Sequence, residues 1–486
     1  TTVNAGTLTV TGSGTLGNTS SLLTISSATL DLQNALTIGS LSMSGTSPAI
    51  TNTTGTSSLV VNGTSTLAGN ITTSGAQTYT GAVTLSGGDR TLSGSTITTN
   101  DTLVGDTNAL TISGNAVFGD GITDRVSGVT TLYVSGTTLI NTDSISSSST
   151  QTYNGAVTLG NSSTLTTTNA QVTFNSTVNA EASEANALTL NVGTSEVEFN
   201  GVVGGGTNGA LGAVAITGAL DLNAAITSAA SLTVSTTSDL GANVTTSGTQ
   251  TYSGAVTLSG GDRTLTGSTI TNSSTITGAT FSLTETGNAV INGAISGVNV
   301  LSISGTSTIG ANVTTSGTQT YTGAVTLSVS ATLTTTSNTI TFSSTLNAVD
   351  ATDRDLTFGA GSGNVIFTGA VGGTYNLGTI TDIAGQTLTF SDAVTATTIA
   401  NYGTLLFNAT SAKTISPAIT DNGTTTIQVI DSTDGAPGII TFSGNIAADT
   451  ITIGTTTKAG SALFNGTVTG TNVNIVGGDT SEASLG

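Results

Sequence analysis

The residues of this chain that could do chemistry are mostly carboxylates, because its 486 residues include 26 Asp and Glu, six Lys and Arg, and no Cys or His. Two neighbouring carboxylates such as Glu196 and Glu198 could hydrolyse a glycosidic bond. An internal copy of this segment argues against that role, since it has Asn364 and Ile366 at the two acidic positions and keeps only the apolar residues beside them. We therefore expect solvated acids on an outer surface, no catalytic residue and no enzymatic activity.

Asp431 and Asp434 are the candidates for a calcium site, in the acidic turn DSTDGAPG (431–438), and a second acidic turn, GDGITD, spans 119–124. Turns of this kind can offer oxygen ligands to Ca²⁺. Neither turn matches an EF-hand loop or the glycine-rich nonapeptide of calcium β-rolls. Without Cys or His, the usual ligands of zinc, copper, haem iron and iron–sulfur clusters are missing. The sequence therefore predicts ordinary polar turns and no cofactor.

Four tyrosines and two Asp–Arg dipeptides recur inside repeated segments. Each tyrosine ends a Gln-Thr-Tyr element, and this constant position predicts either a structural stack or a periodic sticky strip, of which we favour the stack. Each dipeptide ends a GGDR turn, in which Asp tolerates unusual backbone angles and Arg lies over the surface. The repeated structural positions are Tyr79, Tyr153, Tyr252, Tyr321, Asp89, Arg90, Asp262 and Arg263.

The elements that must position these residues are short β-strands. Apolar residues alternate with Thr or Ser in runs such as TLTV (7–10), AVTL (82–85) and ALTI (109–112). Alternation with period two indicates half-buried strands, and β-branched Thr and Val suit a pleated sheet. Gly, Asn and Asp separate the runs, as turn residues do. No segment has a sustained helical period, so the sequence predicts an all-β protein.

The chain also repeats itself over long distances. Residues 71–98 match residues 244–271 at 24 of 28 positions, an offset of 173. A second pair of segments, 151–180 and 319–348, matches at 20 of 30 positions, an offset of 168. We therefore expect one continuous architecture over 1–486. Its long super-repeat, of about 170 residues, covers 71–243 and 244–412, with a partial third copy at 413–486.

A shorter period lies within the super-repeat. The Gln-Thr-Tyr elements start at Gln77, Gln151, Gln250 and Gln319, and their successive residue numbers differ by 74, 99 and 69. These differences are close to three, four and three steps of about 24 residues, a period typical of solenoids. The sequence thus predicts a parallel β-solenoid, or β-helix, of about 20 coils with about 24 residues and three strands in each. Strands one coil apart would be separated by about 4.8 Å, which makes a rod of roughly 100 Å. A string of β-sandwich domains would instead repeat near every 100 residues or so.

The elements QTYTGAVTLSGG (77–88), QTYNGAVTLG (151–160) and NVIFTGAVGG (364–373) resemble repeats of filamentous-haemagglutinin-like adhesins and autotransporter passengers, which are large bacterial surface proteins. The resemblance covers most of 65–375 and, less clearly, 380–478. It implies a right-handed β-helix, export through the outer membrane and an adhesive, structural or biofilm role. No catalytic residue carries over, and type V export is implied by the family alone.

The net charge of −20 restricts the partners. Six scattered basic residues cannot neutralise a phosphate backbone as nucleic-acid binding requires, and anionic membrane surfaces are disfavoured for the same reason. No apolar run approaches the roughly 18 residues of a membrane helix, so no membrane insertion is expected. The absence of Cys fits an intracellular protein or a bacterial export substrate. The chain begins at Thr1 in a strand-like pattern, without an initiator Met or a signal peptide, so we expect a processed or excised segment.

These observations predict a non-enzymatic, extracellular structural protein of a bacterial outer surface. It would be a rigid β-solenoid that builds a cell-surface fibre or filament with an adhesion or biofilm role. Residues Thr1–Val10 and Val473–Val476 are strand-like and carry no polar cap, and uncapped strand edges favour end-to-end stacking of identical copies. The alternatives are the stalk or passenger of a secreted adhesin that binds surface carbohydrate, and a polysaccharide-active β-helix enzyme.

Overall fold

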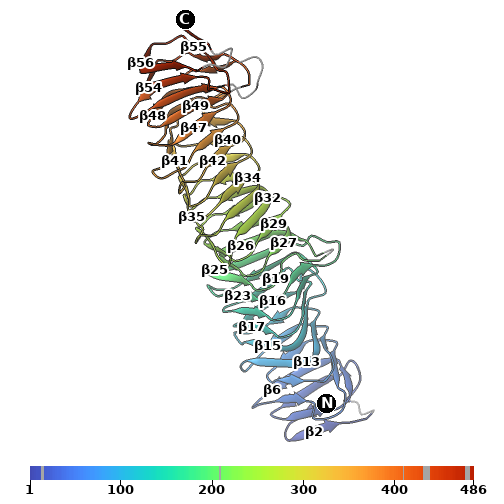
Figure 1. Cartoon of the computed structure of the whole chain (residues 1–486). Helices are drawn as coiled ribbons and strands as arrows, with labels where there is room; N and C mark the ends of the chain where they lie inside the picture. The colour runs from blue at the N-terminus through green and yellow to red at the C-terminus, as the bar shows by residue number, and fades with distance from the viewer. Residues whose placement is uncertain (13–15, 207–208, 409, 431–437, 477–481, 486) are drawn as a thin grey trace. The chain divides into compact units, whose positions relative to one another are not determined.

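A computed structural model describes the chain except for residues 13–15, 207–208, 409, 431–437, 477–481 and 486. It divides into two compact units, Thr1–Gly248 and Thr249–Gly486. The described residues form strands joined by turns, without a helix, and the strands of each unit pair in parallel as successive coils (Figure 1). This confirms the predicted all-β, parallel β-solenoid, and the described residues make about 23 turns. None of them belongs to a helix long and apolar enough to span a membrane.

Many coils consist of three short strands, each paired with a strand of the next coil, whereas in others one long strand occupies two of these positions. One coil of the second unit consists of β38 (Val313–Thr315), β39 (Gln319–Tyr321) and β40 (Val325–Leu327). These strands pair respectively with β41 (Ala331–Thr334), β42 (Ile340–Phe342) and β43 (Leu346–Ala348) of the next coil. The period-two alternation explains the packing: in β42, Ile340 and Phe342 are buried in the core, whereas Thr341 faces outward and is half-buried.

Residues at the same position in successive coils form ladders through the core. In the second unit, strand register aligns Tyr321, Phe342, Phe367, Phe390 and Phe407. The rings of neighbouring members stack, with centroid separations of 5.2, 5.0, 4.8 and 5.5 Å. A shorter ladder in the first unit joins Tyr153, Phe174 and Phe199 at 5.3 and 5.2 Å. The large side chains of the core thus lie one above another along the coils.

The coils are less regular than the constant step that the sequence predicts. Paired residues of adjacent coils differ in residue number by 17 at Ala229 and Thr246, and by 27 at Ile419 and Ile446. Surface turns of different lengths account for this range, because extra turn residues leave the paired strands unchanged.

The Gln-Thr-Tyr spacing suggested too long a step because these elements do not share one ladder. Gln77 pairs with Ile97 of the next coil, and the same ladder continues through Ala116 to Thr138. Gln151 lies two strands beyond that ladder and pairs with Leu132. The segment between the two glutamines therefore covers three coils and two further strands. Successive members of the ladder differ in residue number by only 20, 19 and 22, so these coils are shorter than predicted.

Candidate functional site

The four repeated tyrosines are buried in the core, where each hydroxyl donates a hydrogen bond to the glutamine two residues earlier. All four side chains are 0% exposed. Their Oη atoms lie 2.9 to 3.1 Å from the glutamine Oε1 atoms. Burial raises the pKa of each tyrosine well above its ordinary value, so the hydroxyls stay protonated. A ligand cannot reach these rings, which removes the sticky-strip interpretation for Tyr79, Tyr153, Tyr252 and Tyr321.

The glutamine amides connect neighbouring coils. Gln77 Nε2 donates to the carbonyl of Ser93 in the next coil at 2.8 Å and to Thr73 Oγ1 at 3.3 Å. Gln319 makes the corresponding bonds to the Thr334 carbonyl at 2.8 Å and Thr315 Oγ1 at 3.3 Å. A buried amide with partners on two coils satisfies polar groups that would otherwise be costly to bury. The Gln-Thr-Tyr element thus has a structural position in both units.

The tyrosines do not stack on one another. Tyr79 is aligned with Val61 and Thr99, whereas Tyr153 is followed by Phe174. The stack expected from the sequence is therefore a mixed ladder, in which a tyrosine is followed by whatever residue the next coil provides.

We expect Tyr79→Phe to lower the free energy of unfolding by about 1–3 kcal/mol, because it leaves the buried Gln77 Oε1 without its donor. Chemical unfolding followed by circular dichroism measures this. The control is Tyr133→Phe in the same unit: Tyr133 is 39% exposed, and its hydroxyl accepts a hydrogen bond from Asn154 Nδ2 at the surface, where water can replace that bond. Surface changes of this kind are usually within about 0.5 kcal/mol. Equal stability of the two variants would show that the Gln77–Tyr79 bond contributes nothing specific.

The arginines of the GGDR turns fold back onto main-chain carbonyls instead of lying over the surface. Arg90 is only 9% exposed, and its Nε lies 3.0 Å from the carbonyl oxygens of both Leu67 and Ser86. Arg263 Nε likewise lies 3.1 Å from the Ser259 carbonyl. The guanidinium groups therefore close the turns on which they lie.

The aspartates of these turns connect to the next coil. Asp89 Oδ1 accepts the backbone N–H of Ala109 at 2.9 Å, and Asp262 Oδ1 accepts that of Ser282 at 2.8 Å. The unusual backbone angles lie on the glycines, with φ of 70° at Gly87 and 126° at Gly88, and not on the aspartates as expected. Both Asp–Arg dipeptides thus form hydrogen bonds to main-chain groups of their own turn and of neighbouring coils.

The paired acids lie on the outside, as the internal copy suggested. Glu196 is exposed and Glu198 half-buried on the outer face of β25 (Leu188–Phe199). Gln171 Nε2 donates to both carboxylates, at 3.0 and 3.3 Å, and Thr173 Oγ1 lies 3.3 Å from Glu198 Oε2. These hydrogen bonds connect two neighbouring coils, so the two glutamates stabilise the outer surface of the solenoid.

The predicted calcium candidates Asp431 and Asp434 lie outside the described residues. In the other acidic turn, Asp124 Oδ2 accepts the backbone N–H groups of Asp120 and Gly121 at 3.0 and 2.9 Å. That carboxylate thus holds its own turn. Among the residues that the structure describes, no cluster of three or more His, Cys, Asp or Glu could hold a metal ion.

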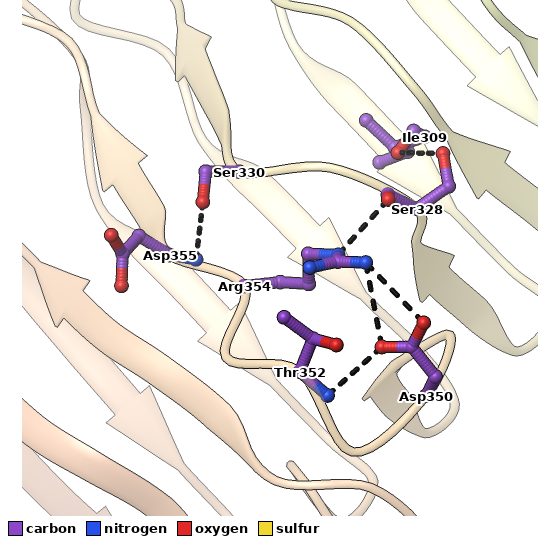
Figure 2. A network of polar contacts seen from close by, with 7 residues as sticks. All are labelled: Ile309, Ser328, Ser330, Asp350, Thr352, Arg354 and Asp355. Atoms are coloured by element: carbon purple, nitrogen blue, oxygen red, sulfur yellow. Dashed lines mark hydrogen bonds and ion pairs between the residues drawn. The ribbon is translucent and has the colours of Figure 1, made fainter.

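Arg354 is the centre of a polar network on a turn of the second unit (Figure 2). Its Nε donates to the Ser328 carbonyl at 3.0 Å, and its Nη2 lies 3.4 Å from Asp350 Oδ1. Hydrogen bonds from Thr352, with a smaller contribution from the Arg354 charge, hold the pKa of Asp350 below its ordinary value. Asp355 accepts the Thr379 N–H in the next coil at 2.6 Å. The network thus holds the turn between the strands that end at Ala348 and begin at Leu356.

The last described coils of the second unit expose part of the core. β56 (Val468–Ile475) aligns Val473 with Ile451 and Ile475 with Ile453. Both isoleucines are 0% exposed, whereas Val473 and Ile475 are each 54% exposed although they occupy inward-facing positions. A cavity of about 540 Å³ opens here, with Ile451, Phe464 and Val468 in its lining. β57 (Glu482–Leu485) begins a further coil, and its Ala483 and Ser484 also line the cavity, but it pairs with β55 (Ser461–Phe464). Among the described residues, no strand pairs with the outer side of β56.

One buried pair was missed by the sequence reasoning. Glu285 and Asn272 are 0% and 1% exposed, and Asn272 Nδ2 donates to Glu285 Oε1 at 3.0 Å. A signal was present, because Glu285 has the same strand parity as the apolar Leu283 and therefore faces the core.

No protein-family model matches this chain. No curated protein and no solved structure matches it either. The resemblance to adhesin repeats therefore remains an expectation that rests on the quoted motifs alone.

Proposed function

We propose that this chain is a non-enzymatic structural protein that stacks end to end with other copies to build an extracellular fibre on a bacterial surface. The observation that carries the proposal is the exposure of Val473 and Ile475, two apolar residues at inward-facing positions of β56. Adhesion or a biofilm matrix is the role that such a fibre would serve.

The first strands of the first unit form a second edge, which could pair with β56 of another copy. β1 (Thr2–Val3) and β2 (Thr7–Val10) pair on one side with β3 (Leu22–Ser26) and β4 (Thr29–Leu32). Among the described residues, no strand covers their other side. Unpaired N–H and C=O groups of an edge strand are a template for another strand. A contact between two different ends does not close on itself, so it generates a filament.

The side faces support a structural role. The reactive side chains described above bond to turns or neighbouring coils, as in the Gln77–Tyr79 pair and the Arg90 turn. The net charge of −20 opposes sideways association of the proposed fibres, because like-charged surfaces repel. Growth along the axis is then favoured over lateral clumping.

The test is a pair of substitutions on the exposed strand β56. Val473→Glu combined with Ile475→Glu would place two carboxylates inside the end contact, where burial without a partner costs several kcal/mol. We expect this variant to stay monomeric at concentrations at which the unaltered chain forms end-to-end particles in negative-stain electron microscopy. Both residues are about half exposed, so the fold itself should tolerate the change.

The matched control is Asn474→Glu, on the same strand. Asn474 is exposed and is aligned with Thr452, at an outward-facing position, so this variant should still form fibres. Fibres of the unaltered chain should give a meridional reflection near about 4.8 Å, the spacing of stacked strands. Monodisperse monomers of the unaltered chain at high concentration would overturn the stacking proposal and favour the stalk of an adhesin.

A further inference from the structure

The Asn272–Glu285 pair lies inside the second unit between two consecutive coils. Asn272 ends β32 (Arg263–Asn272), and Glu285 lies on β34 (Leu283–Ile291) of the next coil. The bond from Asn272 Nδ2 to Glu285 Oε1 uses one polar atom of each side chain. The other two, Asn272 Oδ1 and Glu285 Oε2, are buried without a hydrogen-bond partner in the part of the chain that the structure describes. Both are acceptors if the carboxyl group is ionised, so no bond between them can form in that state.

A proton on Glu285 Oε2 resolves this arrangement. The protonated oxygen becomes a donor, and the acceptor that needs one is Asn272 Oδ1 of the same pair. A carboxylic acid and a carboxamide can then form two reciprocal hydrogen bonds, N–H to Oε1 and O–H to Oδ1. We propose that Glu285 is a neutral acid paired in this way with Asn272, and that loss of its proton loosens these coils of the second unit.

The surroundings offer no positive charge to stabilise the ionised form. Strand register places Leu265 and Ile303 on either side of Glu285, while Tyr252 neighbours Asn272 and Tyr321 lies beyond Ile303. The two tyrosines are the titratable groups that face the pair, and the charge of an ionised Glu285 raises their pKa further.

Charged groups elsewhere on these strands are directed away. Arg263, at the start of β32, bonds to the Ser259 carbonyl of its own turn. None of the ion pairs among the described residues includes Glu285. An ionised Glu285 would thus be a buried carboxylate with a single donor, which is a costly state.

The sign of the pH dependence follows from the same burial. Burial raises the pKa of Glu285 to about 7, and the hydrogen bond from Asn272 offsets only part of that shift. In the unfolded chain the pKa of a glutamate carboxyl is about 4.3. The folded state therefore holds an extra proton between these values. The contribution of Glu285 to the free energy of unfolding is therefore fully present below about pH 4. It decreases as the pH rises and is lost once the pH passes about 7.

The first unit contains the same structural positions without the pair. Thr99 and Ile112 precede Asn272 and Glu285 by the offset of 173 that relates the two long repeats. They have the same register, with Thr99 beside Tyr79 and Ile112 beside Leu92. The amide and the acid thus occur together in one copy and are both replaced in the other. The fold therefore forms without this acid, and the buried pair is specific to the second unit.

The test compares thermal unfolding of the unaltered chain with that of Glu285→Gln at about pH 4, where the stabilisation is still nearly full, and at about pH 8.5. Glutamine can make the same two reciprocal hydrogen bonds with Asn272 but cannot ionise. We expect similar melting temperatures at the lower pH. At the higher pH the unaltered chain should melt roughly 5–10 °C below the variant. Asp382, whose pKa burial raises to about 6, titrates in both proteins and cancels from the comparison.

Two further variants and an infrared measurement test the protonation of Glu285 directly. The double variant Asn272→Thr, Glu285→Ile copies the first unit and should also lose the extra pH dependence, whereas Asn272→Thr alone should be destabilised at both pH values. Isotope-edited infrared spectra at about pH 5 should show a protonated carboxyl band that Glu285→Gln removes. An ionised Glu285 at that pH, or the same pH dependence in Glu285→Gln and the unaltered chain, would overturn the proposal. This inference concerns one unit and does not depend on end-to-end stacking.

Discussion

Replacing Phe367 by Ala is expected to lower the free energy of unfolding by about 5 kcal/mol, the upper end for a buried aromatic residue. Phe367 is fully buried, and its ring stacks on Phe342 at 5.0 Å and on Phe390 at 4.8 Å. It also meets the edge of Phe358 at 6.2 Å. Aromatic contacts add about 0.5–1.5 kcal/mol each beyond the buried area, and the truncation removes all three. Urea unfolding followed by circular dichroism measures the loss.

Two controls separate the aromatic contacts from the burial. Phe367→Leu keeps most of the volume, so it should lose only about 1–3 kcal/mol. The neighbouring Ile366 faces outward and is 36% exposed, so Ile366→Thr should change stability by less than about 0.5 kcal/mol. If Phe367→Leu were as unstable as Phe367→Ala, the stacked rings and not the filled volume would hold this part of the core.

Gly305→Ala is expected to cost about 3 kcal/mol or more, because the coils approach too closely for a side chain at this turn. Gly305 N–H donates to the Gly287 carbonyl of the previous coil at 3.0 Å. A Cβ on Gly305 would overlap that same carbonyl group, and a Cβ on Gly323 would overlap the carbonyl of Gly305. The obstructing atoms are backbone, so they can move only if the coils separate. Thermal unfolding of the purified variant measures the effect.

The matched control for this glycine is Gly373→Ala in the same unit. The nearest atom to an added Cβ there is the Cβ of Ala370 at 3.8 Å, which is an ordinary contact. The change should be neutral or slightly stabilising, because alanine restricts the unfolded chain. Equal loss in both variants would show that the close approach of coils at Gly305 is not the cause of the destabilisation.

The fold class could be predicted because the alternation of apolar and polar residues in each strand shows which side chains are buried. Alternation such as that of Ile340, Thr341 and Phe342 is a local property that the structure reproduces. The internal copies also located the outward acids correctly, since Glu196 and Glu198 have the opposite parity to Val197 and Phe199. The same parity could have placed Glu285 in the core, in line with Leu283.

The length of the coils could not be predicted from the repeated elements. Gln77 and Gln151 look equivalent in sequence, yet they lie on different ladders. A turn can gain or lose residues without changing the strands that it joins, so sequence spacing does not reveal which strands become neighbours. The burial of the tyrosines and their bonds to glutamine also required the positions of the surrounding coils.

The sequence by itself determined the all-β class, the repeated coils, the strand faces and the scarcity of reactive groups, because period-two alternation and composition are local properties. Only the tertiary structure decided which side chains meet across coils: Phe367 with Phe390, Gln77 with Ser93, and Glu285 with Asn272. In each pair the two partners belong to different coils. Turn length and strand register set such contacts, and a pattern of single residues does not contain either of them.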